Sequence, residues 1–236
     1  MGKRIIQQAR GKGGPRYKSP SFRYLDDIKF RSLGVENVNG FVRDFTKCPG
    51  HYCPLAAIEF EDGFRSFMIA PEGLRVGDKI SYCDNEVEAG NVLILKNIPE
   101  GTEIFNIESM PGDGGKFCRT SGTSAKVVSK TETQAVVLLP SKRKKNFNLK
   151  CRACIGIVAG GGRPEKPFLK AGNKHHAMKA RNKLYPLTNA SAMNNVDHPF
   201  GNKRTSRKAR QKGASKFAPP GRKVGKLWPK RTGKRN

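Results

Sequence analysis

The uneven distribution of charge constrains the fold of this chain more than any other feature of its sequence. The 236 residues carry 46 Lys and Arg against 19 Asp and Glu, a net charge of +27. Residues 35–100 nevertheless hold eleven acidic and only six basic residues, whereas residues 169–236 hold one acidic and nineteen basic residues. Self-repulsion on this scale opposes compaction unless a polyanion neutralises it. The pattern therefore predicts a folded middle between two basic extensions.

The excess of cations also indicates the class of partner. Nucleic acid is the expected polyanion, and an anionic membrane surface is the alternative. No apolar run reaches the roughly 18 residues that a membrane-spanning helix needs, and residues 1–14 lack the apolar core of a secretory signal. Nucleic acid is therefore the favoured partner.

Residues 169–236 have too few apolar side chains to fold alone. Only eight of these 68 residues are Leu, Ile, Val or Phe, which is below the roughly 20% associated with disordered chains. A flexible linker or a localisation signal is one interpretation of such a tail. The aromatic residues scattered among its cations favour another, because Tyr185, Phe200, Phe217 and Trp228 can stack on RNA bases. We therefore expect a tail that is disordered alone and orders on RNA.

The middle of the chain predicts an all-β core. Short runs rich in Val, Ile and Phe, separated by turn residues, occupy 38–45, 55–62, 64–71, 74–83 and 90–97. A second set occupies 104–109, 124–131, 133–140, 146–151 and 154–160. The first set suits an OB-fold barrel and the second an SH3-like barrel. Because no helix-length segment separates the strands, we expect no parallel pairing.

These segments divide the chain into four parts. A basic N-terminal extension (1–35) precedes the OB-fold barrel (36–97), and the SH3-like barrel (98–168) precedes a basic C-terminal extension (169–236). Pro99 marks the joint between the two barrels. Both extensions are expected to become ordered on RNA.

Two glycine-rich segments carry side chains that suit contact with a phosphate backbone. In the loop 111–125, Gly112, Gly114 and Gly115 allow the backbone to approach a ligand closely. The segment 156–167 is also glycine-rich and leads into the basic tail. The expected phosphate-binding side chains of the two segments are Lys116, Arg119, Ser121, Thr123, Arg163 and Lys166. A plain long loop between strands is the alternative interpretation of the first segment.

The six cysteines raise the question of a metal site. Cys151 and Cys154 form a CxxC pair, and Cys48 and Cys53 flank His51. Structural zinc needs two close pairs in loops, whereas Cys151 and Cys154 lie on or between predicted strands. Burial as small hydrophobic residues is therefore favoured over zinc, and a disulfide framework is not expected in a chain of this size.

The histidines offer little for catalysis. His198 follows Asp197 in the segment 192–201, but adjacent side chains diverge, and the chain has no GxSxG nucleophile elbow. A turn built on Asp197, Pro199 and Gly201, with Gly201 supplying a left-handed exit, is favoured over a catalytic pair.

Several long blocks of the sequence resemble one protein family. They are APEGLRVGD (70–78), IPEGTEIFNIESMPGDGGKFCRTSGT (98–123), CRACIGIVAGGGRPEKPFLKAGNKHHAMKAR (151–181), AMNNVDHPFG (192–201) and APPGRKVG (218–225). With these blocks the chain is similar to ribosomal large-subunit protein two of the archaeal type over essentially its whole length. It departs from that family where Asn202 replaces a glycine after HPFG and where His51 replaces an arginine.

The resemblance implies a fold and a function. The implied fold is an OB-fold barrel followed by an SH3-like barrel, with an extension at each end. The implied function is that of a structural constituent of the large ribosomal subunit, which binds large-subunit rRNA near the peptidyl transferase centre. There it supports subunit association, tRNA positioning and peptide bond formation by RNA, so the protein itself is not expected to be an enzyme.

The resemblance also implies partners and RNA-binding residues. The partners are large-subunit rRNA, neighbouring ribosomal proteins and small-subunit rRNA at the inter-subunit face, with the protein a monomer within the cytoplasmic ribosome. No cofactor is expected beyond structural Mg²⁺ ions bridging to rRNA, no membrane is involved, and no catalytic or metal-binding residue is assigned. The candidate RNA-binding residues beyond the two glycine-rich segments are Lys170, Lys174, His175, Lys179, Arg181, Asn194, Asp197, His198, Lys203, Arg204, Arg222 and Lys223.

Two other classes of protein are alternatives to this interpretation. A free single-strand-binding or chromatin-compacting protein also suits an OB barrel with basic tails. The acidic first barrel and the glycine-punctuated extensions argue against it. A hydrolase acting through His198 would need a nucleophile that the sequence does not offer.

Overall fold

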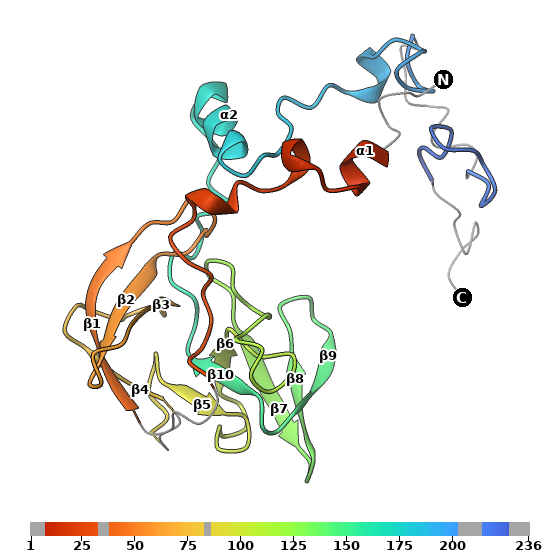
Figure 1. The fold of residues 1–236 in the computed structure, drawn as a ribbon. Helices are drawn as coiled ribbons and strands as arrows, with labels where there is room; N and C mark the ends of the chain where they lie inside the picture. The colour runs from red at the N-terminus through yellow and green to blue at the C-terminus, as the bar shows by residue number, and fades with distance from the viewer. Residues whose placement is uncertain (1–7, 33–37, 83–85, 203–213, 227–236) are drawn as a thin grey trace. The chain divides into compact units, whose positions relative to one another are not determined.

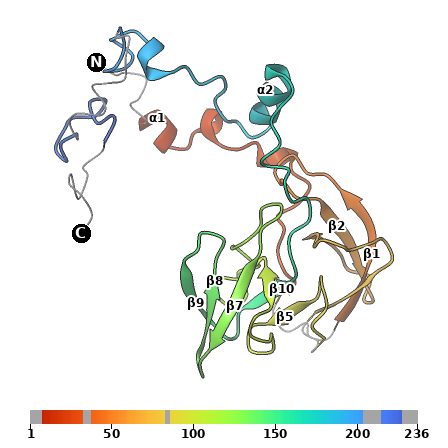
Figure 2. The same ribbon diagram turned by 180° about the vertical axis from the view of Figure 1, so that it is seen from behind.

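The computed structural model describes residues 8–32, 38–82, 86–202 and 214–226. The chain divides into two compact units. The strand unit is the continuous segment Ser21–Leu169, which holds every strand of the described residues (Figures 1 and 2). The tail unit combines Met1–Pro20 with Lys170–Asn236.

The strand unit is built on one ten-stranded sheet. Its strands are β1 (Val38–Thr46), β2 (Leu55–Phe60), β3 (Arg65–Ile69), β4 (Lys79–Tyr82), β5 (Val92–Ile94), β6 (Glu103–Phe105), β7 (Ala125–Lys130), β8 (Gln134–Leu138), β9 (Lys144–Asn148) and β10 (Arg152–Ile155). Their order across the sheet is β3-β2-β1-β4-β5-β10-β6-β7-β8-β9. Every predicted run overlaps one strand, although β9 and β10 each begin two residues before their runs, so the all-β core is confirmed.

The expectation of purely antiparallel pairing is wrong at one position. Strands β4 and β5 run parallel and meet at a single residue pair, Tyr82 and Val92. The Asn91 side chain connects this junction, because its Oδ1 accepts a hydrogen bond from the Ser81 amide at 3.0 Å and its Nδ2 donates to the Glu86 carbonyl at 3.1 Å. A buried side-chain amide thus supplements the short ladder, and the pattern of apolar residues carries no signal for it.

Two clusters of buried side chains fill the strand unit. Core 1 consists of Ile28, Phe30, Val42, Cys48, Cys53, Leu55, Ala56, Ile58, Phe60, Met68, Ile69, Ala70, Ile80, Tyr82, Val92, Phe105, Cys154 and Val158. Core 2 consists of Leu93, Leu95, Ile98, Ile104, Ile107, Ala125, Val127, Ala135, Val137, Phe147, Cys151, Ala153 and Ile155. The central strands β5, β10 and β6 contribute to both cores, because successive side chains of a strand point to opposite faces.

The strand unit begins earlier than the expected end of the N-terminal extension at residue 35. Residues 21–32 belong to it, and Ile28 and Phe30 are 2% and 7% exposed in core 1. The Phe30 ring also lies edge-on to Tyr82, with ring centres 6.3 Å apart. The prediction rests on the net charge of the whole segment 1–34, which carries no information on these two apolar residues.

The tail unit contains the longest helix of the described residues, α2 (Ala171–Lys179), which the sequence analysis did not predict. Shorter helical segments are α1 (Gln8–Gly11) and the 3-10 turns Pro15–Tyr17 and Ala190–Ala192; a further 3-10 turn, Ser21–Arg23, opens the strand unit. None of the α2 residues is buried, so this helix lacks the apolar stripe that would have revealed it. Among the described residues no helix is long and apolar enough to span a membrane.

Candidate nucleic-acid interface

The first glycine-rich loop, residues 111–125, rests on a buried ion pair. Glu108 and Arg152 are 0% and 3% exposed, and Glu108 Oε1 accepts hydrogen bonds from Arg152 Nη2 at 2.8 Å and Nε at 3.2 Å. Glu108 Oε2 accepts from the Arg152 amide at 2.8 Å, and Oε1 also accepts from the Gly114 amide at 3.3 Å. Arg152 Nη1 donates to the Arg31 carbonyl at 2.7 Å. The pair therefore joins strand β10, the loop and the N-terminal segment.

The space beside two of the loop glycines is filled by the chain itself. A Cβ atom at Gly114 would lie 2.8 Å from Lys29 Cβ, and one at Gly115 would lie 2.8 Å from the Asn106 carbonyl oxygen. Both glycines also have positive φ angles, 81° and 94°. On their Cβ sides Gly114 faces Lys29 and Gly115 faces Asn106, so the absent side chains make room for packing within the chain. The close approach of this loop to a ligand stays a prediction.

Arg119 also joins the loop to the N-terminal segment around Ile28. Its Nη1 donates to the Gly115 carbonyl at 3.1 Å and its Nη2 to the Ile28 carbonyl at 2.9 Å. Burial lowers the pKa of the Arg119 guanidinium, although such a group stays charged at neutral pH. The side chain thus has a structural role that the sequence did not reveal, and its contact with RNA stays a prediction.

The other candidate residues of this loop differ in their access to solvent. Lys116 is exposed, whereas Ser121 is 4% exposed and its hydroxyl has no hydrogen-bond partner among the described residues. The Thr123 hydroxyl donates to the Thr120 carbonyl at 2.5 Å. Lys116 is therefore the side chain of this loop best placed to meet an external phosphate.

The second glycine-rich segment packs closely against the first through its backbone. A Cβ atom at Gly122 would lie 2.7 Å from Gly161 Cα, and the Gly122 amide donates to the Val158 carbonyl at 2.9 Å. Arg163 donates to the Tyr52 carbonyl, and its guanidinium carbon lies 6.0 Å from the centre of the Tyr52 ring. The two segments therefore lie side by side, and the exposed cations of the second, Arg163 and Lys166, are presented by a fixed backbone.

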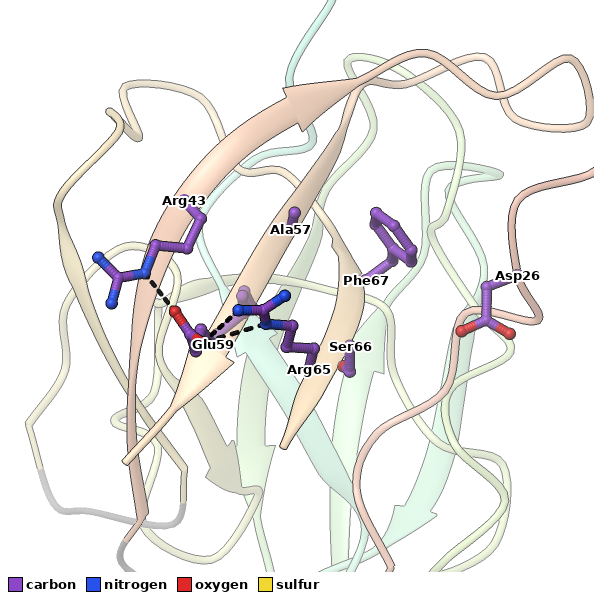
Figure 3. A pocket seen from close by; sticks show the side chains of 8 residues that line it. Asp26, Arg43, Ala57, Glu59, Arg65, Ser66 and Phe67 are labelled. Carbon is purple, nitrogen blue, oxygen red and sulfur yellow. Dashed lines mark hydrogen bonds and ion pairs between the residues drawn. The ribbon is translucent and has the colours of Figure 1, made fainter. Parts of the chain in front are cut away.

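A charged cluster on β1, β2 and β3 was missed by the sequence analysis (Figure 3). Glu59 accepts hydrogen bonds from Arg43 Nε at 2.6 Å and from Arg65 Nη2 at 2.8 Å and Nε at 3.0 Å. These arginines, Arg65 first and then Arg43, hold the pKa of the Glu59 carboxyl below its usual value. The cluster borders a cavity of about 440 Å³ that Ala57 and Phe67 also line. Arg43 and Glu59 each follow a buried apolar residue, Val42 and Ile58, and these charged residues within apolar strand runs are the signal that could have revealed the cluster.

The candidate residues around α2 are mostly exposed. Lys170, His175 and Lys179 face solvent, while Lys174 and Arg181 are half-buried. The basic side chains of α2 have no acidic neighbour on the same helix. This part of the tail unit therefore offers positive charge that no carboxylate of α2 neutralises.

The segment 192–202 forms the predicted turn. The Asn194 carbonyl accepts hydrogen bonds from the amides of Asp197 at 3.0 Å and His198 at 3.1 Å. His198 is 9% exposed, and its Nδ1 accepts a hydrogen bond from the Phe200 amide at 3.1 Å. The ring is therefore fixed by the backbone of its own turn.

The expected role of Gly201 in this turn is wrong. Its φ angle is not left-handed, and Asn202 adopts the left-handed conformation instead, with φ of 55°. Asparagine tolerates this conformation better than most residues. Gly201 is needed for a different reason, because a Cβ atom there would collide with the Asn194 carbonyl group.

The remaining candidates lie near the C-terminal end. Arg222 and Lys223 are exposed. Lys203 and Arg204 lie outside the described residues. No group of three or more His, Cys, Asp or Glu residues that could hold a metal ion occurs in the described part of the chain.

Comparison with known proteins identifies the family. The family model for "Ribosomal Proteins L2, C-terminal domain" matches residues 88–218. Proteins named "Large ribosomal subunit protein uL2" from Halorubrum lacusprofundi and Haloarcula marismortui are 49% and 48% identical, over 99% of this chain and 98% of each relative. The chain belongs to the uL2 family of ribosomal proteins, in its archaeal form. The uL2 protein of Archaeoglobus fulgidus is 48% identical over the full length of both chains.

The uL2 family model covers most of the candidate interface. Its range, 88–218, includes both glycine-rich segments, α2 and the turn at 192–202. It begins after β3, so the cluster around Glu59 lies outside it. The uL2 relatives from whole-chain comparison extend the likeness to that part as well.

Proposed function

We propose that this member of the uL2 family binds large-subunit rRNA near the peptidyl transferase centre and holds RNA segments together there. Membership of the family makes the chain a structural constituent of the large ribosomal subunit in the cytoplasm. The observation that carries the proposal is the similarity along the whole chain to proteins named for that subunit. The exposed cations on fixed loops and on α2 support it.

The mechanism is neutralisation of phosphate charge by side chains on a rigid frame. Lys116, Arg163 and Lys166 extend from loops that the chain's own contacts hold in place, so little entropy is lost when they meet RNA. Each phosphate so neutralised releases counterions and allows neighbouring RNA segments to approach. We infer that core 1 belongs to an OB-fold barrel and core 2 to an SH3-like barrel, with the tail unit ordered by RNA. Structural Mg²⁺ ions bridging to rRNA are the only ions proposed.

The turn at 192–202 is proposed to position RNA, while peptide bond formation belongs to the RNA itself. A neutral imidazole whose Nδ1 accepts a hydrogen bond carries its proton on Nε2. His198, whose Nδ1 accepts from the Phe200 amide, can then donate to an RNA oxygen through Nε2, which suits a positioning role. Its neighbours in the turn, Asn194 and Asp197, are proposed to contribute to the same contact. We also propose that the protein supports subunit association and tRNA positioning. Its partners there are small-subunit rRNA and neighbouring ribosomal proteins, and it is present as a single copy.

Sedimentation of ribosomes tests the proposed function. The tagged chain is expressed in its source cell, and subunits are separated after a wash in moderate salt. We expect the chain to sediment with the large subunit and to be released by ribonuclease but not by deoxyribonuclease. A chain that stays at the top of the gradient, or that is released by deoxyribonuclease, would instead be a free single-strand-binding or chromatin protein.

A further inference from the structure

A cavity of about 890 Å³ lies within the tail unit. We call it the tyrosine pocket, and its lining residues are Arg10, Tyr17, His175, Met178, Lys179, Asn182, Lys183, Leu184, Tyr185 and Leu187. The Asn182 side-chain amide donates to the Lys18 carbonyl at 2.8 Å, which joins the N-terminal segment to the segment after α2. None of the lining residues is acidic.

Each tyrosine of the pocket lies beside a cation. The Arg10 guanidinium carbon is 5.6 Å from the centre of the Tyr17 ring, and Lys174 Nζ is 5.3 Å from the centre of the Tyr185 ring. Tyr17 is 40% exposed and Tyr185 is half-buried, so both rings keep accessible surface. Aromatic surface flanked by cations matches the two parts of a nucleotide, an apolar base face and a charged phosphate.

The apolar side chains and the size of the cavity agree with such a ligand. Leu184 and Leu187 line the pocket and are 59% and 76% exposed. Large apolar side chains that remain exposed beside an aromatic wall mark a surface to be covered. Cavities that bind small molecules measure about 300–1,000 Å³, so the tyrosine pocket has room for one nucleotide and part of its neighbours.

We propose that the tyrosine pocket receives one unstacked nucleotide of rRNA. The base stacks on Tyr17 or Tyr185, and its phosphates meet the cations Arg10, Lys174 and Lys179. The inference rests on the proposed RNA-binding function and narrows it to unpaired RNA. Bases inside an A-form duplex cannot reach an aromatic wall, whereas a bulged or loop nucleotide can be extended into a pocket at low cost.

The test compares two RNA hairpins with the full chain. Both carry 2-aminopurine, whose fluorescence falls when it stacks, once as a single-nucleotide bulge and once paired with uridine in the stem. Affinity and fluorescence are measured at one salt concentration for the wild type, Tyr185→Ala and Tyr185→Phe. Lys174→Ala is compared with Lys166→Ala, an exposed cation of the strand unit that lies outside the pocket.

We expect the wild type to prefer the bulged hairpin and to quench its 2-aminopurine. Tyr185→Ala should lose about five- to a hundredfold in affinity for the bulge, the range for loss of one stacked base, with less than a twofold change for the paired stem. Tyr185→Phe keeps the ring and should keep the preference. Lys174→Ala should weaken binding of the bulge more than that of the stem, whereas Lys166→Ala should weaken both equally.

Three results would refute the proposal that the tyrosine pocket binds an unstacked nucleotide. They are equal affinity of the wild type for the two hairpins, unquenched 2-aminopurine in the complex, and equal loss by Tyr185→Ala on both RNAs. Should Tyr185→Ala disturb the tail unit, Tyr17→Ala repeats the comparison from the opposite segment. A chain that sediments with the large subunit but shows no preference for the bulge refutes only the pocket, whereas a chain absent from the subunit refutes the proposed function.

Discussion

The buried pair of Glu108 and Arg152 predicts a large loss of stability when one partner loses its charge. Glu108 accepts four hydrogen bonds, three of them from Arg152 and one from Gly114. In Glu108→Gln the side chain keeps its size, but one oxygen becomes an amide that donates, so a donor faces a donor and the Arg152 charge is unpaired. Leaving a buried charge unpaired costs about 3–5 kcal/mol. For a domain of this size such a loss lowers Tm by roughly 6–20 °C.

The assay is thermal unfolding of the full chain, followed by circular dichroism. Glu59→Gln is the matched control, because Glu59 is also paired with arginine, here with Arg43 and Arg65, but on a solvent-exposed face. We expect little change in the Tm of this variant. The double variant Glu108→Leu with Arg152→Met should be more stable than the sum of the single losses predicts, since no charge remains unpaired. Equal, small decreases in Tm for Glu108→Gln and Glu59→Gln would refute the structural role of the pair.

Three further predictions concern local contacts. Arg119→Ala removes two charge-assisted hydrogen bonds, so the amides around Ile28 should exchange hydrogen at least tenfold faster; unchanged exchange would mean that Arg119 does not hold this segment. Gly201→Ala places a methyl group against the Asn194 carbonyl, so the variant should enter large subunits poorly, and normal incorporation would contradict this. Burial raises the pKa of the Cys151 thiol to about 11. At pH 8 Cys151 should therefore react with iodoacetamide far more slowly in native than in unfolded protein, and equal rates at Cys151 would disprove its burial.

The positions of the strands could be predicted because each buried run is short, apolar and bounded by turn residues. The antiparallel pairing of the other neighbouring strands could also be predicted. The single parallel pair between β4 and β5 could not, because the side chain of Asn91, which reaches across to Ser81, supports it. The position of the central strand β10 could be predicted from the sequence. That its side chains are divided between core 1 and core 2 could not. Alternation places Cys154 in core 1 and Ala153 in core 2, and this becomes visible only once the neighbouring strands are known.

The structural contacts of several candidate residues could not be predicted from the sequence. Arg119 has the charge expected of a phosphate ligand, but the carbonyl of Ile28, 91 residues away in the chain, takes one of its hydrogen bonds. The sequence signals the conformational freedom of glycine at Gly114 and Gly201. In the structure a side chain at either position would also collide with a neighbour, and these neighbours are known only from the folded chain. The tyrosine pocket likewise joins segments that lie more than 150 residues apart, such as Tyr17 and Tyr185.

The central claim, that the chain is an rRNA-binding constituent of the large subunit, is tested most directly by a map of that subunit that resolves side chains. The account predicts one copy of the chain per subunit, with the side chains of Lys116, Lys166 and Lys179 within hydrogen-bond distance of rRNA phosphates. It also predicts that Glu108 contacts Arg152 and no RNA. A map without the chain, or one in which these lysines face solvent or protein while rRNA meets only the face around Glu59, would contradict the account.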